Sequence, residues 1–188
     1  LGVDHLLVLP THQGLARAFM AGLEESLRLG ADVIVNTDGD NQYDARDLER
    51  LIAPILEGSA DLVVGDRDLQ AIGHFSAVKK LLHRLGDRIM VRLAGIDRMD
   101  STSGFRAYSR EAALRLNVFS RFTYTLETLI QAGKKGLAVA HVPVGVNQKL
   151  RDSRLFPSLW SYLKRSGSTM VRIYALYEPL KVFSYLGA

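Results

Sequence analysis

The stretch of sequence that decides the fold is DVIVNTDGDNQ, residues 32–42. Its first half is a short β-branched run, which predicts a buried strand over residues 32–36. Its second half is polar and contains a glycine, so we expect the strand to end in a turn. Ligands of open α/β sheets bind outside the carboxyl ends of the strands. The side chains of Asp38 and Asp40 are therefore expected where such a sheet places its binding site.

Short apolar runs and helical patterns alternate on both sides of this stretch. Runs bounded by Gly, Pro, Asp or Asn predict further strands at residues 5–9, 61–65 and 137–142. Apolar residues at helical spacing predict helices at residues 15–29, 45–56, 75–93, 110–116, 124–132 and 158–177. Strands that alternate with helices are typical of right-handed crossovers. We therefore expect an α/β fold with a mainly parallel sheet flanked by helices.

The composition is that of a soluble globular domain and excludes several classes of protein. The chain has 188 residues, of which 47% are hydrophobic and 23% charged, which suits one domain with a real core and excludes a disordered or collagen-like chain. It has no cysteine, which excludes a disulfide scaffold, a thiolate zinc site and a cysteine nucleophile. Its longest apolar stretches are shorter than the ~18 residues that a membrane-spanning helix needs.

Basic residues gather at the C-terminal end of the chain. Residues 149–188 hold seven Lys or Arg and two acidic residues, a net charge of +5, so residues 1–148 carry −1 of the total +4. We expect two regions: a folded domain over residues 1–148, and a basic loop with a C-terminal amphipathic helix over residues 149–188. The chain starts with Leu1 inside what reads as a strand, so we expect it to be a fragment of a longer protein.

The turn after residue 36 has the composition of a metal site. Asp38 and Asp40 are separated by one residue, and Gly39 permits a tight turn, so both carboxylates can point at one hard divalent cation, Mg²⁺ or Mn²⁺. Gln42 adds a neutral oxygen on the same side. A solvated Asp/Gly turn would have the same sequence. A phosphatase with an aspartyl nucleophile also places this pattern after a strand, but it expects Ser or Thr at the position of Gln42.

Four motifs resemble those of family 2 glycosyltransferases with the GT-A fold, in the polyprenyl-phosphate (dolichyl-phosphate mannose synthase-like) branch. Along the chain they are residues 11–18 (THQGLARA), the metal-site residues Asp38, Asp40 and Gln42, residues 63–67 (VVGDR) and residues 100–106 (DSTSGFR). The resemblance runs along essentially the whole chain. Two parts of the family pattern are missing, namely the N-terminal strand and helix with their Asp-Asp-Gly-Ser segment, and the C-terminal membrane-spanning helices that many relatives have.

The resemblance implies an activity and a set of partners. It implies transfer of a sugar, with inversion, from a nucleotide-diphosphate sugar to a polyprenyl phosphate at the cytoplasmic face of a membrane. Residues 1–148 would be the catalytic domain, N-terminally incomplete, and the amphipathic segment 158–185 would lie on the membrane surface or else pack on the domain. We expect no nucleic-acid partner, because aromatic and basic residues do not interleave in a recognisable motif. A non-catalytic module that binds sugar nucleotides or docks on a membrane remains an alternative.

The resemblance also suggests roles for charged residues outside the metal turn. Arg67 is a candidate catalytic residue that would bind pyrophosphate together with Asp38, although it could instead pair with a neighbouring aspartate. Asp100 and Arg106 are candidate catalytic residues of the acceptor pocket, with Asp100 as a base or a positioning group. Glu127 would hold Arg106 or the site. Three basic residues after the last predicted strand would bind phosphates, or else form a solvated loop: Lys149, Arg151 and Arg154.

Overall fold

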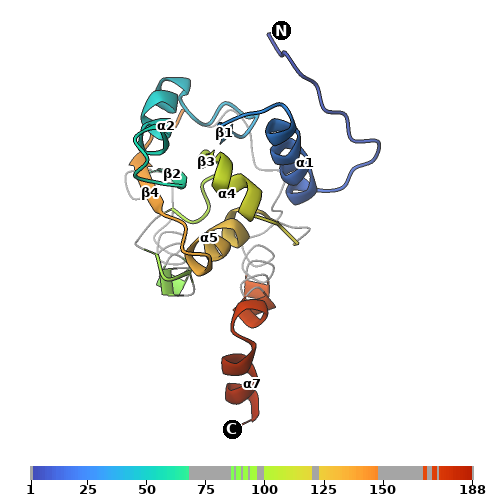
Figure 1. The fold of residues 1–188 in the computed structure, drawn as a ribbon, viewed down its shortest axis with the longest axis vertical. Helices are drawn as coiled ribbons and strands as arrows, with labels where there is room; N and C mark the ends of the chain where they lie inside the picture. Colours follow the sequence, from blue (N-terminus) through green and yellow to red (C-terminus); the bar gives the residue numbers. More distant parts are fainter. Residues whose placement is uncertain are drawn as a thin grey trace.

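The computed structural model describes residues 2–67, 86–96 without 87, 90 and 93, 100–119, 123–147, and 167–187 without 169, 170 and 173. A four-stranded sheet lies at the centre of the molecule (Figure 1). Its strands are β1 (Val33–Asn36), β2 (Leu62–Asp66), β3 (Arg106–Ser109) and β4 (Val139–Pro143), in the order β1-β3-β2-β4. β1, the strand predicted at residues 32–36, therefore lies at one edge of the described sheet.

The sheet is mixed, with three strands in one direction and one against them. β3 pairs antiparallel with β1, from Val33 opposite Ser109 to Asn36 opposite Arg106. β3 also pairs antiparallel with β2, and β2 pairs parallel with β4. β1, β2 and β4 thus end at the same edge, as expected for an α/β fold. The sequence analysis did not predict β3, because its four residues, RAYS, contain no apolar run.

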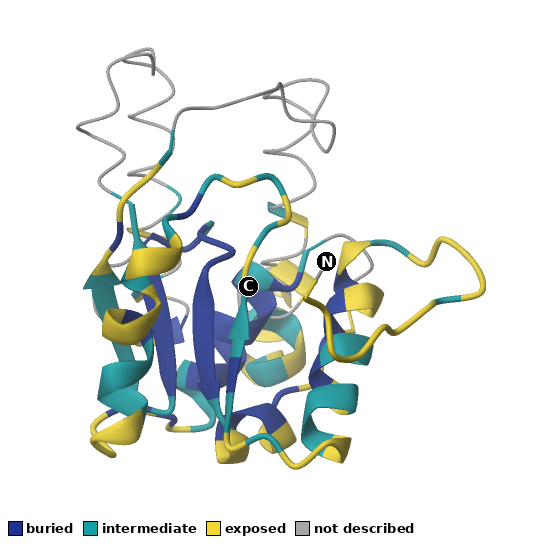
Figure 2. Ribbon diagram, turned by 90° about the horizontal axis from the view of Figure 1, so that it is seen from above, coloured by how far each residue is buried: buried dark blue, intermediate teal, exposed yellow. Residues whose placement is uncertain are grey.

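Helices cover both faces of the sheet. Their bounds are α1 (Leu15–Arg28), α2 (Leu48–Leu56), which follows the 3-10 turn η1 (Ala45–Asp47), α4 (Arg110–Arg115), α5 (Thr125–Lys134) and α7 (Pro179–Gly187). α1, α4 and α5 share one apolar core with Ile34, Leu62 and Tyr108 of the strands, whereas α2 packs on the alternate strand residues Val63 and Ala107. Figure 2 shows the central strands buried between helices whose outer sides are exposed, and the edge strands as intermediate. Successive side chains of a strand point to opposite faces of the sheet, so alternate residues of the same strand belong to different cores.

Local sequence explains where the main helices lie. The buried residues of α1 are Ala16, Phe19, Met20 and Leu23, an i, i+3, i+4, i+7 pattern that gives the helix one apolar face. Ser109 ends β3 and its hydroxyl accepts a hydrogen bond from the backbone N–H of Ala112, which caps α4. One residue thus ends a central strand and starts the helix that returns over the sheet.

Most of the predicted elements are confirmed to within about two residues, which is ordinary boundary error. The prediction of a strand at residues 5–9 is wrong. These residues form no strand in the structure, and the side chains of Leu6 and Val8 are 82% and 72% exposed. An apolar run becomes a strand only when its backbone groups find ladder partners, and within the described part of the chain it pairs with none. The helices predicted at residues 75–93 and 158–177 lie largely outside the described residues, although those described at 86–94 and 167–177 are helical.

The C-terminal helical residues attach to α5 and then leave the body of the molecule. The ammonium of Lys134 pairs with the carboxylate of Glu178 at 2.6 Å and lies 5.8 Å from the ring centre of Tyr174. Tyr177 packs against the larger core. Beyond Glu178, α7 projects away from the sheet (Figure 1). No helix in the described part of the chain is long and apolar enough to cross a membrane.

Candidate functional site

The predicted metal turn lies directly after β1. Asn41 has a backbone φ of 60°, a left-handed conformation that Asn tolerates better than most residues. The carboxylate of Asp40 accepts hydrogen bonds from the backbone N–H of Gln42 at 3.2 Å and from its side-chain Nε2 at 2.9 Å. The turn therefore brings two of the three predicted metal ligands into contact.

The carboxylate of Asp38 lies against the backbone of Gly104. A Cβ built on Gly104 would be 2.6 Å from Oδ2 and 2.9 Å from Oδ1 of Asp38. The glycine of the segment DSTSGFR thus leaves room for this carboxylate. Burial raises the pKa of Asp38, and so does the charge of Asp40, while Arg67 and Arg106 act in the opposite direction.

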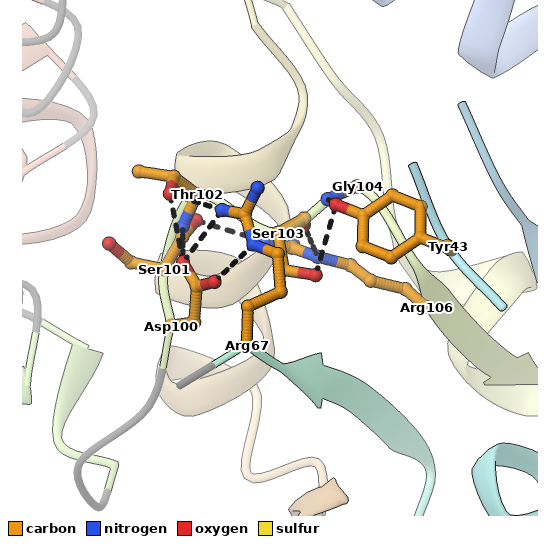
Figure 3. A network of polar contacts seen from close by, with 8 residues as sticks. All are labelled: Tyr43, Arg67, Asp100, Ser101, Thr102, Ser103, Gly104 and Arg106. Atoms are coloured by element: carbon orange, nitrogen blue, oxygen red, sulfur yellow. Dashed lines mark hydrogen bonds and ion pairs between the residues drawn. The ribbon is translucent and has the colours of Figure 1, made fainter. Parts of the chain in front are cut away.

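Arg67 and Asp100 form a buried ion pair (Figure 3). Nε of Arg67 donates to Oδ2 of Asp100 at 2.7 Å, and Nη2 donates to Oδ1 at 3.2 Å and to the hydroxyl of Thr102 at 2.9 Å. The side chains of Arg67 and Asp100 are only 15% and 2% exposed. Thr102 also binds Asp100: its backbone N–H and its hydroxyl both donate to the Asp100 carboxylate.

This pair fixes the charge states of both groups. Burial alone would raise the pKa of Asp100, but the charge of Arg67 and the hydrogen bonds from Arg67 and Thr102 outweigh it and hold that pKa below its usual value. Burial likewise disfavours the charged form of Arg67, and Asp100 more than compensates, so the pKa of Arg67 is raised. Asp100 is therefore ionised and poorly suited to accept a proton near neutral pH.

Arg106 is fully buried, contacts Ser101 and Ser103 (Figure 3) and joins residues 100–106 to α5. Its guanidinium donates to the carbonyl oxygens of Ser101 and Ser103 at 2.9 and 2.8 Å, and to the carbonyl of Thr125 and the hydroxyl of Thr128 at 2.8 and 2.9 Å. Glu127 was expected to hold Arg106 or the site, and this stays a prediction. Its carboxylate accepts from the backbone N–H of Phe119 at 2.8 Å and from the side-chain amide of Gln131 at 3.4 Å.

Two residues that the sequence analysis did not single out, Asn36 and Tyr43, bind the backbone of Gly104. Asn36, the last residue of β1, donates to the carbonyl of Gly104 and to the hydroxyl of Tyr124, both at 2.7 Å. The hydroxyl of Tyr43 accepts from the backbone N–H of Gly104 at 3.0 Å, and its ring lies 5.9 Å from the guanidinium carbon of Arg67. The position of Asn36 at the end of the predicted strand was the only sequence signal for it.

The residues present suit a hard divalent cation. The donor set is two carboxylates and one amide oxygen, which Mg²⁺ and Mn²⁺ accept as ligands. Burial and the charge of Asp40 raise the pKa of Asp38 in spite of Arg67 and Arg106, and a bound cation would add positive charge that favours its ionised form. Among the described residues there is no group of three or more acidic or histidine side chains that could hold a metal, so Gln42 would have to complete this set.

The predicted site residues divide into two groups in the structure. Asp38, Arg67, Asp100 and Arg106 come together through Gly104 and its neighbours, and Asp40 and Gln42 lie in the adjoining turn. Lys149, Arg151 and Arg154 lie outside the described residues. All the roles assigned to these side chains stay predictions.

The chain belongs to glycosyl transferase family 2, whose model matches residues 5–116. The mixed sheet flanked by helices agrees with this assignment. Glucosyl-3-phosphoglycerate synthase from Mycobacterium tuberculosis, solved in complex with Mn²⁺, uridine-diphosphate-glucose and phosphoglyceric acid, has the same fold, with a TM-score of 0.63 at 20% identity over 90% of this chain and 56% of that one. The GT-A-like fold class expected from the sequence is confirmed.

Two curated relatives have names that concern lipid-linked sugars. The UDP-N-acetylglucosamine–dolichyl-phosphate N-acetylglucosaminyltransferase of Methanococcus voltae is 33% identical over 141 residues, which are 71% of this chain and 55% of that protein. The undecaprenyl-phosphate mannosyltransferase of Micrococcus luteus is 26% identical over 158 residues, 80% of this chain and 64% of that protein. The chain spans about half the length of curated relatives that it matches.

Proposed function

We propose that this chain is part of a metal-dependent, inverting glycosyltransferase that moves a sugar from a nucleotide-diphosphate sugar to a polyprenyl phosphate. The observation that carries the proposal is the contact between Asp38 and Gly104. It puts the predicted metal carboxylate directly against the segment predicted to receive the acceptor. The names of the relatives support the lipid phosphate, and the Mn²⁺ complex of a protein with the same fold supports the metal.

The described residues have distinct parts in this proposal. Asp38, Asp40 and Gln42 would hold Mg²⁺ or Mn²⁺, which when bound neutralises the charge of the departing diphosphate. Arg67 adds a fixed positive charge beside Asp38, held by Asp100. A phosphate acceptor is already an anion near neutral pH, so it needs no strong base. The ionised, paired state of Asp100 therefore favours a positioning role over proton abstraction.

Membership of the family removes one alternative, and an assay decides the other. The aspartyl-nucleophile phosphatase considered from the sequence does not agree with the family match. For the non-catalytic module, the test is transfer of a labelled sugar from nucleotide sugars to polyprenyl phosphate by the intact protein. We expect Asp40→Asn, and chelation of the wild type, to abolish transfer, and Asp4→Asn, at an exposed aspartate, to leave it unchanged. Undiminished transfer in excess chelator would refute the metal role.

We also propose that the C-terminal segment lies on an anionic membrane surface, where a lipid acceptor would be found. Leu180 and Phe183 of α7 are 83% and 70% exposed. The basic residues Arg172 and Lys181 lie in the same segment. An exposed apolar helix with basic residues gains free energy both from insertion at the headgroup boundary and from attraction to anionic lipids.

Cosedimentation with vesicles tests this membrane contact. We expect the protein to bind anionic vesicles more tightly than neutral ones, and expect high salt to weaken the binding. Leu180→Glu together with Phe183→Glu should reduce binding to both vesicle types, whereas Leu56→Glu, at an exposed leucine at the end of α2, should not. Failure of the wild type to bind either vesicle type would exclude the proposed contact.

A further inference from the structure

The turn that carries Asp40 and Gln42 is held from outside by one asparagine, Asn147. The backbone N–H of Asn147 donates to the carbonyl of Gln42 at 2.8 Å. Its side-chain Nδ2 donates to the carbonyls of Asn41 at 3.0 Å and Tyr43 at 3.3 Å. Asn147 thus binds the carbonyls of three consecutive residues of the predicted metal turn.

Within the described residues, contacts of Asp40 with Gln42 and of Tyr43 with Gly104 also restrain this turn. It lies outside the sheet, and its ladder contact is the isolated antiparallel bridge between Tyr43 and Val146. Asn41 has a left-handed φ, a conformation that is unfavourable for a non-glycine residue and persists where surrounding contacts impose it. The side chain of Asn147 contacts the carbonyl of this same residue.

The segment that presents Asn147 is itself firmly attached. The backbone N–H of Val144 donates to the carbonyl of Asp66 at 3.0 Å. The backbone N–H of Gly145 donates to the carboxylate of Asp47 at 2.6 Å. The segment from Val144 to Asn147 therefore joins the turn to the end of β2 and to η1, so the position of Asn147 relative to Asp40 and Gln42 is set by these elements.

We propose that Asn147 is a positioning residue for the divalent cation, one that acts through the backbone of residues 41–43 and does not touch the metal. The proposal rests on the metal site of the proposed function. Mutation of a residue that orients metal ligands typically costs about 10- to 100-fold in metal affinity or activity. Loss of the two side-chain hydrogen bonds should release Asn41 from its left-handed conformation. Asp40 and Gln42, which stay hydrogen-bonded to each other, should then shift relative to Asp38.

The test is a Mn²⁺ titration of the intact protein, followed by the relaxation of water protons, with Mn²⁺ alone as the probe. Two variants remove the donors of Asn147: Asn147→Ala truncates the side chain, and Asn147→Leu keeps its approximate shape. Asn117→Ala is the matched control, because the hydrogen bonds of Asn117 to Gln131 use its backbone. Asp40→Ala serves as the reference for a lost ligand.

We expect both Asn147 variants to raise the dissociation constant of Mn²⁺ by about tenfold while staying fully folded at the temperature of the titration, as thermal unfolding without metal measures. Asn117→Ala should bind Mn²⁺ as the wild type does. Wild-type affinity in both Asn147 variants, alongside a loss in Asp40→Ala, would overturn this inference and leave the proposed metal site intact. Equal binding by the wild type and Asp40→Ala would overturn both. A loss of affinity only in proportion to a loss of folded protein would make Asn147 merely structural and refute the positioning role.

Discussion

The carboxylate of Asp38 fills the space in which a side chain at Gly104 would begin, with its Oδ2 2.6 Å from the Cβ position. Asp38 follows β1, and Gly104 precedes β3, the strand paired with β1. Antiparallel pairing brings the end of one strand to the start of the other, so residues 66 positions apart in the sequence meet at the same edge. This contact joins the predicted metal turn to the predicted acceptor segment.

Gly104→Ala should therefore impair the site. The new methyl group would force Asp38 to move, since a real Cβ does not approach oxygen atoms at 2.6 Å, and we expect overpacking to cost about 1–3 kcal/mol of unfolding free energy. Mn²⁺ binding and sugar transfer should fall further than stability does. Gly22→Ala is the control, because a Cβ at Gly22 would meet open space. Normal Mn²⁺ affinity in Gly104→Ala would show that Asp38 does not need its present position.

The ion pair between Arg67 and Asp100 predicts a specific dependence of stability on pH. The pKa of Asp100 is lower in the folded protein than its usual value of 3.8, so the unfolded chain binds more protons in the interval between the two values. The stabilisation is therefore complete above pH 3.8 and is lost as the pH falls through the folded pKa. Asp100→Asn should cost about 3 kcal/mol above this interval, because it leaves Arg67 buried without its partner.

Denaturant unfolding of the wild type and Asp100→Asn over a series of acidic and neutral pH values measures this difference. The stability deficit of the variant should shrink towards acid, since the wild type loses the contribution that the variant lacks. Asp4→Asn, at an exposed carboxylate, should show no such trend. A deficit that stays constant at every pH would mean that Asp100 is not stabilised in its ionised form.

Arg106→Lys separates a structural role of Arg106 from the catalytic role predicted from the sequence. A lysine ammonium cannot reach the four acceptors that the guanidinium now satisfies, and each buried acceptor left unpaired costs about 1–3 kcal/mol. We expect a loss of about 3 kcal/mol in unfolding free energy, measured by denaturant titration, and little loss for the exposed Arg110→Lys. Wild-type stability with abolished transfer would instead indicate direct contact between Arg106 and substrate.

Sequence patterns predicted the parts of the fold that depend on local periodicity. The apolar runs at residues 32–36 and 61–65 became β1 and β2: the run of β2 is almost wholly buried in the sheet, and that of β1, at the edge, is half-buried around the buried Ile34. β3 escaped prediction because its first residue is a fully buried arginine, which a hydropathy pattern places outside the core. At residues 5–9 the error was a strand predicted where none forms. These residues are apolar, but they find no ladder partner in the described chain.

The candidate site, like the fold, could be predicted only in part from the sequence. Asp38, Arg67 and Asp100 were found because carboxylates and guanidinium groups after strands are chemically conspicuous. Asn36 and Tyr43 were not found, because hydrogen bonds to the backbone of Gly104 depend on the antiparallel strand that the sequence did not reveal. Residues that act through another residue's backbone carry no motif of their own.

Asn36 and Tyr124 make a coupled pair that a double-mutant cycle can measure. The side-chain nitrogen of Asn36 donates to the Tyr124 hydroxyl and to the carbonyl of Gly104. Tyr124→Phe removes only the hydroxyl and keeps the ring stacked on Phe19 at 4.0 Å, so it should cost about 1 kcal/mol of unfolding free energy. Asn36→Ala removes both bonds, and we expect a coupling energy of about 1 kcal/mol between the two changes.

The effects on sugar transfer should differ more than those on stability. Asn36→Ala frees the carbonyl of Gly104 and with it the backbone against which Asp38 packs, so transfer and Mn²⁺ affinity should both fall. Tyr124→Phe leaves the contact with Gly104 in place and should change them little. Tyr174→Phe, in the C-terminal helical segment, controls for loss of a hydroxyl elsewhere. Equal losses of transfer in Tyr124→Phe and Asn36→Ala would mean that Asn36 acts through Tyr124, and that its bond to Gly104 does not position the site.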